Sequence, residues 1–253
     1  GAWRPIDFPS NPPGRDGRDN VWYRITLPQG GGWADPALFI YSIDLIADIY
    51  LDDERIYRYG SFRPDGSGAF AGWPWHLVPL PADYPGRTLH VRVFSDYKDI
   101  GLWGEVTLDS RSGRVESMVQ SDLPMAVMAL MALVAGLVGL AFFAAQPSAR
   151  EFGFIALYAL TVGGQLAADN QLKQFLLEAP LLWQYLSAIA YFGFGVAVTG
   201  SLWTLAGSRV MAALMGVHLL WLVAAPLAAL AGLVTLADTY PAYDLLLGAS
   251  ALP

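Results

Sequence analysis

The side chains best suited to binding a ligand lie in the first half of the chain, and most of them are aromatic. They lie on or beside short predicted strands and comprise Tyr57, Tyr59, Trp73, Trp75, His76, Arg92, Asp96 and Trp103. Aromatic rings give contact area at small entropic cost, and an arginine or a carboxylate adds direction. These eight residues therefore predict a site for a small ligand or a partner. Alternatively, the same aromatics fill the core, pack against a neighbouring part of the chain or rest on a membrane surface.

Catalytic and metal-binding motifs are missing from the sequence. It has no Ser/His/Asp spacing, phosphate loop, HExxH or GxGxxG pattern, so we predict that this chain is not an enzyme. Cysteine is absent, which excludes disulfides, Cys-ligated zinc, Fe–S clusters and thiol nucleophiles. The acidic run 52–54 offers oxygen ligands for calcium but lacks the spacing of a dedicated loop, so it predicts a solvated turn. We predict no metal site and no cofactor.

Charge is distributed unevenly along the 253 residues. Residues 1–122 hold 12 basic and 17 acidic side chains, whereas residues 123–253 hold only 3 and 5. The first half has the charge density of a soluble domain and the second is too apolar to be one. We therefore predict a β domain over 1–118 and a transmembrane helical bundle over 119–253. The net charge of −7 and the lack of a basic patch exclude nucleic acid as a partner.

The first part contains short runs in which apolar and polar residues alternate, as is typical of strands. Within 88–94, Leu89, Val91 and Val93 alternate with His90 and Arg92, which predicts an aliphatic inner face and a polar outer face. Other strands are predicted at 21–27, 37–43, 48–51, 55–59, 75–80 and 103–108, with a hairpin turn at 52–54. Such strands, separated by Pro and Gly, predict an antiparallel β-sandwich.

The second part consists of apolar segments that match the thickness of a bilayer. Residues 123–145 carry no charge, and about 20 residues cross the hydrocarbon core as a helix. Further spans are predicted at about 152–168, 181–206 and 210–237, and a partial span begins at 241. The lipid bilayer is therefore a predicted partner. With four complete spans and the start of a fifth, the chain looks cut short.

Basic residues between the spans predict the orientation. Arg150 and Arg209 fall in turns on one side, and Lys173 lies with acidic residues on the other. Because cytoplasmic loops are enriched in Lys and Arg, the first part is predicted outside the cytoplasm. That location requires an export signal, so we expect a cleaved signal peptide. Within the spans, His218 is a candidate functional residue or forms a hydrogen bond to a neighbouring helix, and no charged residue accompanies it.

Four segments of the first part resemble sugar-binding jelly rolls. They are IYLDDERIY (49–57), GWPWHLVPLP (72–81), PGRTLHVRV (85–93) and SDYKDIGLWGEV (95–106). The pair Asp52-Asp53 replaces the Asn-Gly usual at the first turn. With RVESMV (114–119) and a span from 123, nearly the whole chain resembles the bacterial seven-transmembrane receptors with diverse intracellular signalling modules.

This resemblance implies a galactose-binding-like jelly roll in the periplasm, a helix bundle in the bacterial inner membrane and a cytoplasmic effector. The effector is not encoded here and could follow Pro253. The expected function is that of a sensory receptor module: the β domain binds a carbohydrate-like ligand or a protein partner, and the bundle relays the signal. The alternative is a non-catalytic accessory or structural subunit of a larger membrane complex. A homodimer or a larger membrane complex is also expected.

Overall fold

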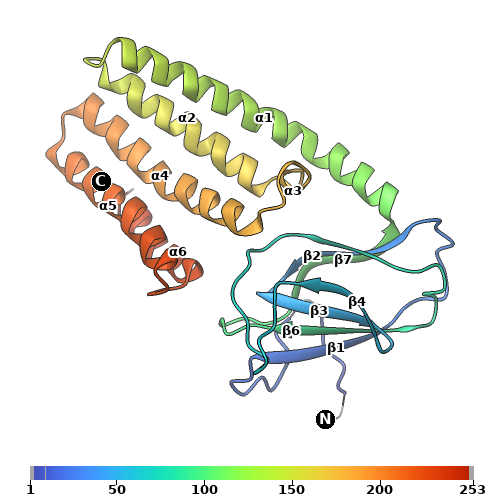
Figure 1. Ribbon diagram of the computed structural model, residues 1–253. Coiled ribbons are helices and arrows are strands. Elements are labelled where there is room, and N and C mark those ends of the chain that lie inside the picture. The colour runs from blue at the N-terminus through green and yellow to red at the C-terminus, as the bar shows by residue number, and fades with distance from the viewer. Residues whose placement is uncertain (1–2, 9, 251–253) are drawn as a thin grey trace. The chain divides into compact units, whose positions relative to one another are not determined.

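A computed structural model describes residues 3–8 and 10–250 of the chain (Figure 1). The chain separates into two compact units at the Ser121–Asp122 boundary, and Glu178–Leu181 group with the first. We call them the N-terminal unit, which contains the strands, and the helical unit. The prediction of antiparallel sheets followed by helices is confirmed.

The N-terminal unit contains two antiparallel sheets. The four-stranded sheet has the order β1 (Asn20–Thr26), β6 (Thr88–Phe94), β3 (Ile46–Leu51) and β4 (Glu54–Tyr59). The three-stranded sheet has the order β5 (His76–Pro79), β2 (Pro36–Ile43) and β7 (Leu102–Ser110). All seven correspond to strands predicted from alternation. Strands β1 and β7 are edges of their sheets, and so are β4 and β5.

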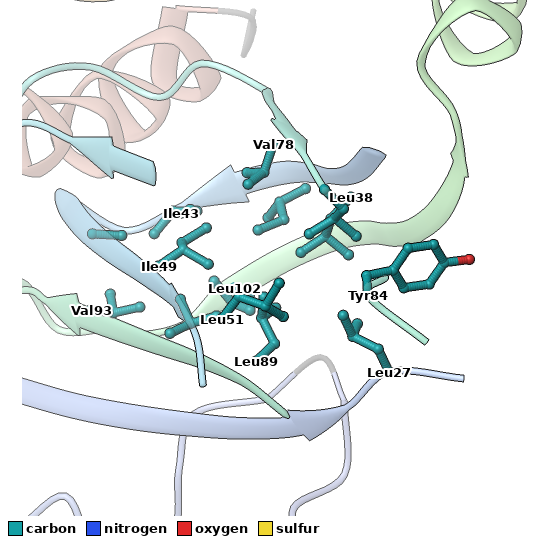
Figure 2. Packing of buried hydrophobic residues seen from close by; sticks show 14 of the residues in the cluster. Leu27, Leu38, Ile43, Ile49, Leu51, Val78, Tyr84, Leu89, Val93 and Leu102 are labelled. Atoms are coloured by element: carbon teal, nitrogen blue, oxygen red, sulfur yellow. The ribbon is translucent and has the colours of Figure 1, made fainter. Parts of the chain in front are cut away.

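Both sheets contribute to one hydrophobic core. Leu38 and Ile43 of β2 belong to the same buried cluster as Ile49 of β3 and Val93 of β6, and Figure 2 shows their side chains gathered between the strands. The alternation predicted for β6 is confirmed, because its aliphatic side chains are fully buried while those of His90 and Arg92 are only half-buried. The period-two pattern therefore fixes which face of this sheet is the core.

The acidic hairpin turn is also present, and its carboxylate has partners within the unit. Asp52 adopts a left-handed conformation, with φ of 54°, in the turn between β3 and β4. Its carboxylate accepts hydrogen bonds from Arg87 Nε at 2.8 Å and from the Thr88 backbone N–H at 3.0 Å. The Thr88 N–H and the Arg87 guanidinium hold the pKa of this carboxyl below its usual range. The turn is thereby tied to the start of β6.

The helical unit is built mainly from long apolar helices. The helices are α1 (Arg111–Ala145), α2 (Arg150–Asp169), α3 (Lys173–Leu176), α4 (Pro180–Ala206), α5 (Arg209–Leu230) and α6 (Leu236–Ser250). Among the described residues, four of them (α1, α2, α4 and α5) are long and apolar enough to cross a membrane. Small residues allow close packing: a Cβ at Gly136 would meet Leu160 of α2, and one at Gly193 would meet Thr161 of α2.

Three helices begin or end more than two residues away from the spans predicted on them, and one of these is α6, which begins at Leu236, whereas the partial span is predicted from 241. The fourth span, predicted to reach residue 237, ends at Leu230, because Gly232 follows with a left-handed φ of 71° that ends a helix. The first span, predicted from 123, belongs to a helix that starts at Arg111. Ser110 caps this helix by accepting a hydrogen bond from the Gly113 N–H at 3.0 Å. Hydropathy locates the apolar run but not the polar turns that extend it.

Candidate functional site

The eight predicted site residues do not converge on one place. Tyr57 and Tyr59 lie on β4, and His76 lies at the start of β5, so this group joins the edge strands of the two sheets. Tyr57 Oη lies 3.0 Å from His76 Nδ1, a hydrogen bond whose direction depends on the imidazole tautomer. The Tyr59 ring packs edge-on against the imidazole, with centroids 4.7 Å apart. The three side chains close one side of the two-sheet core.

Burial determines the charge of this histidine. Only 1% of His76 is exposed, and desolvation lowers the pKa of its imidazole to about 3. Burial also raises the pKa of the Tyr57 hydroxyl to about 12. Both groups are therefore neutral at ordinary pH, and a ligand could reach the imidazole only if the tyrosines moved. In this arrangement His76 joins the two sheets.

The two predicted tryptophans lie near this group but in different surroundings. Trp73 packs edge-on against Phe70, with ring centroids 4.9 Å apart, and also contacts Tyr97. Trp75 lies with its ring 6.3 Å from that of Phe39 on β2. Both tryptophans are half-buried, so they expose part of a ring without forming a common wall.

The remaining three predicted residues occupy other positions. Arg92 donates from Nε and Nη2 to Asn20 Oδ1, at 3.1 and 2.9 Å, and its guanidinium lies 4.2 Å from the centroid of the Phe62 ring. Trp103 donates from Nε1 to the Asp44 carboxylate at 2.5 Å, and burial raises the pKa of that carboxyl. Asp96 is exposed in the loop after β6. Binding through these eight residues stays a prediction.

A cleft that the sequence reasoning missed lies at the opposite edges of the sheets. It has a volume of about 590 Å³ and is formed by residues 3–6, Phe8, β1 and β7. Its walls are Trp3, Arg4, Pro5, Ile6, Phe8, Trp22, Tyr23, Arg24, Ile25, Leu102 and Val106. The signal was present in β1, where the outward positions of an alternating strand carry Trp22 and Arg24. Nothing in the pattern showed that residues 3–8 pack beside that strand.

The charges of this cleft are all positive. Its lining includes Arg4 and Arg24 and no carboxylate. Within residues 3–8 and 10–250, neither guanidinium forms an ion pair, and Arg24 lies 4.8 Å from the centroid of the Trp3 ring. Cations favour this position over an indole face. The cleft therefore combines flat apolar surface with two unneutralised positive charges.

A second notable arrangement fastens the start of α1 to the sheets within the N-terminal unit. Arg114 forms a bidentate pair with Glu105 of β7, at 2.9 and 2.7 Å, and its guanidinium lies 3.6 Å from the centroid of the Phe39 ring. The Ser112 N–H donates to the Asp35 carboxylate at 2.9 Å. Bidentate pairing fixes geometry as well as charge. The first turn of α1 is thereby held on β2 and β7.

A buried polar group in the helical unit is centred on His218 of α5. Its Nδ1 lies 3.0 Å from Tyr243 Oη and its Nε2 lies 3.0 Å from Ser250 Oγ, both on α6. Tyr243 Oη also donates to the Phe192 carbonyl of α4 at 2.7 Å, and the direction of its hydrogen bond with the imidazole depends on the tautomer. Both ring nitrogens therefore have partners, which supports a role in joining α4, α5 and α6.

No group of three or more His, Asp or Glu side chains within residues 3–8 and 10–250 is arranged to hold a metal ion. Comparison with protein-family models gave no match, and comparisons with curated proteins and with solved structures gave none either. The function is therefore argued from the contacts of the chain itself.

Proposed function

We propose that the chain is the sensory part of a bacterial inner-membrane receptor. In this proposal, the N-terminal unit is a jelly-roll-like domain in the periplasm that binds a ligand or partner, and the helical unit passes the bound state to a cytoplasmic effector. The resemblance to seven-transmembrane receptors with intracellular signalling modules motivates the proposal. Four apolar helices support the membrane location, and Arg150 and Arg209 at the starts of α2 and α5 support the orientation.

The attachment of α1 to the sheets carries the proposal. Helix α1 has 35 residues, about 52 Å at 1.5 Å per residue, whereas a hydrocarbon core is about 30 Å thick. Its first turn is held by Arg114 on Glu105 and Phe39, and its later residues form the most apolar span of the chain. A change in β2 or β7 would therefore act on the first turn of the helix whose later residues are apolar enough to cross a membrane.

Topology provides the first test. Alkaline phosphatase is active only outside the cytoplasm, so we expect activity when it is fused after residue 110 and none when it is fused after residue 150. The opposite pattern would overturn the periplasmic location.

The chain purified at native expression should also not carry other membrane subunits in fixed proportion. Such co-purification would favour the alternative, an accessory subunit of a larger complex.

Loss of the Arg114 contact should release the first turn of α1. In the full chain in lipid nanodiscs, we expect Arg114→Ala to raise amide hydrogen exchange in residues 112–118 about tenfold, since a hydrogen bond to a charged group contributes about 1.5 kcal/mol or more. Arg111→Ala is the matched control, because Arg111 is exposed and forms no ion pair among the described residues. Equal exchange in both variants would show that the contact does not hold the helix.

A further inference from the structure

We propose that the cleft beside β1 and β7 binds a small cyclic carboxylate, meaning a ring that can stack on an indole and that bears one acidic group. The ring would lie against Trp3, Trp22 and Phe8, and the carboxylate would pair with Arg4 and Arg24. The inference rests on the proposed function, because it specifies the class of ligand that the N-terminal unit would sense. It does not use the eight residues predicted from the sequence.

The position and size of the cleft fit a small molecule. Strands β1 and β7 are free edges of the two sheets, so their outer sides are not covered by another strand. Tyr23 and Ile25 of β1 and Leu102 and Val106 of β7 form its apolar part, and residues 3–8 complete it. The volume of about 590 Å³ lies in the range typical of small-ligand sites, about 300–1,000 Å³.

The charges indicate that the ligand is an anion. Several arginines of this unit form ion pairs, among them Arg58 with Asp48, Arg87 with Asp52 and Asp83, and Arg114 with Glu105. The cleft brings together two arginines that form no ion pair among the described residues, in a half of the chain where acidic side chains outnumber basic ones. A guanidinium fork matches a carboxylate in a bidentate manner. A carboxylate is therefore the group that this cleft lacks.

The aromatic side chains indicate that the ligand has a flat face. Trp3, Phe8 and Trp22 are 46%, 49% and 45% exposed and line the same cleft, and exposed apolar side chains that gather in one patch mark binding sites. The Trp22 ring is supported from the side by Tyr50, with centroids 5.7 Å apart. Such rings stack on flat surfaces at small entropic cost, because an aromatic side chain has only two rotatable bonds. Aromatic acids present a flat ring with a carboxylate, and acidic sugars present a carboxylate beside a C–H face that can also stack on an aromatic ring.

Binding to the full chain in nanodiscs tests the proposal with defined probes. The acids are 4-hydroxybenzoate and galacturonate, and the neutral counterparts are 4-hydroxybenzyl alcohol and galactose. In calorimetry, we expect at least one acid to bind about tenfold more tightly than its neutral counterpart. The acid that binds shows whether the ligand is an aromatic acid or an acidic sugar. Binding should weaken with added salt. If neither acid binds, or if a neutral counterpart binds equally well, the proposal is overturned.

Two arginine variants test whether the acid binds in this cleft. Arg24→Gln should weaken binding of the acid about tenfold, whereas Arg63→Gln, an exposed arginine outside the cleft, should leave it unchanged. Equal melting temperatures of the two variants show that both fold, and unchanged affinity in Arg24→Gln overturns the site. If no acid binds but the alkaline phosphatase fusions give the expected topology, only this ligand class is rejected. If an acid binds but the fusions give the opposite topology, the receptor orientation is rejected and the cleft site is retained.

Discussion

Replacing Gly195 by alanine should destabilise the helical unit by about 1–3 kcal/mol, the usual cost of one extra group in a packed interior. A Cβ at this position would overlap Tyr243 Oη and lie 2.5 Å from His218 Nδ1. Both atoms are held in place by hydrogen bonds, Tyr243 to the Phe192 carbonyl and His218 to Ser250. Relief of the overlap must therefore break a buried hydrogen bond or separate α4 from α5 and α6. Either response is costly, because unpaired polar groups in a bundle find no water.

A matched control isolates this packing effect from helix propensity. Gly216 lies on α5, and a Cβ there would meet nothing within 4 Å. Gly216→Ala should leave stability unchanged or raise it slightly, since alanine favours helix more than glycine by about 1 kcal/mol. Unfolding of the full chain by increasing mole fractions of SDS, followed by circular dichroism, measures both variants. Equal midpoints for the two would show that the bundle is not packed tightly around His218.

The parts of the fold that follow from a periodic pattern in the sequence were predictable. Alternation in β6 separates buried Val91 and Val93 from half-buried His90 and Arg92, so the sequence of this strand alone predicts which of its faces is buried. Uncharged runs likewise locate the helices that are long and apolar enough to cross a membrane. The end of α5 was missed because one glycine, Gly232, decides it through a left-handed backbone conformation. Mean hydropathy over many residues does not detect a turn that one residue determines.

The candidate site was less predictable, because it depends on which edges of the sheets meet. The sequence shows aromatic residues on β4 and before β5, but the hydrogen bond between Tyr57 and His76 joins two different sheets, and no spacing along the chain predicts that contact. The cleft at the other edges needs residues 3–8 to pack beside Trp22 and Arg24. Alternation gave the outward direction of those two side chains but not their neighbours.

The stability of the N-terminal unit should fall as the pH is lowered from 6.5, because of His76. The ordinary pKa of a histidine is 6.5, and burial lowers that of His76 to about 3. Above pH 6.5 the imidazole is neutral in the folded and unfolded chain, so it adds no pH dependence. Between pH 6.5 and 3 the unfolded chain binds a proton that the folded chain excludes. The free energy of unfolding then decreases by about 1.4 kcal/mol per pH unit, or about 2.7 kcal/mol by pH 4.5.

Denaturant unfolding of the full chain in nanodiscs at pH 7.5 and pH 4.5, followed by near-UV circular dichroism, measures this slope. His76→Gln should be less stable than the natural chain at pH 7.5, because it loses the hydrogen bond to Tyr57, but should lose far less stability on acidification. His90→Gln is the control, since His90 is half-buried on the outer face of β6, and it should keep the slope of the natural chain.

The difference between the natural chain and His76→Gln is the decisive quantity. Carboxyls such as those of Asp52 and Glu105, whose pKa values are lowered by arginine and backbone partners, contribute a slope of their own below about pH 4. They are present in both proteins, so their contribution cancels in the difference. If the two proteins lose stability equally between pH 7.5 and 4.5, His76 titrates normally. Its imidazole would then be open to solvent, and the β4–β5 edge would be a candidate ligand site again.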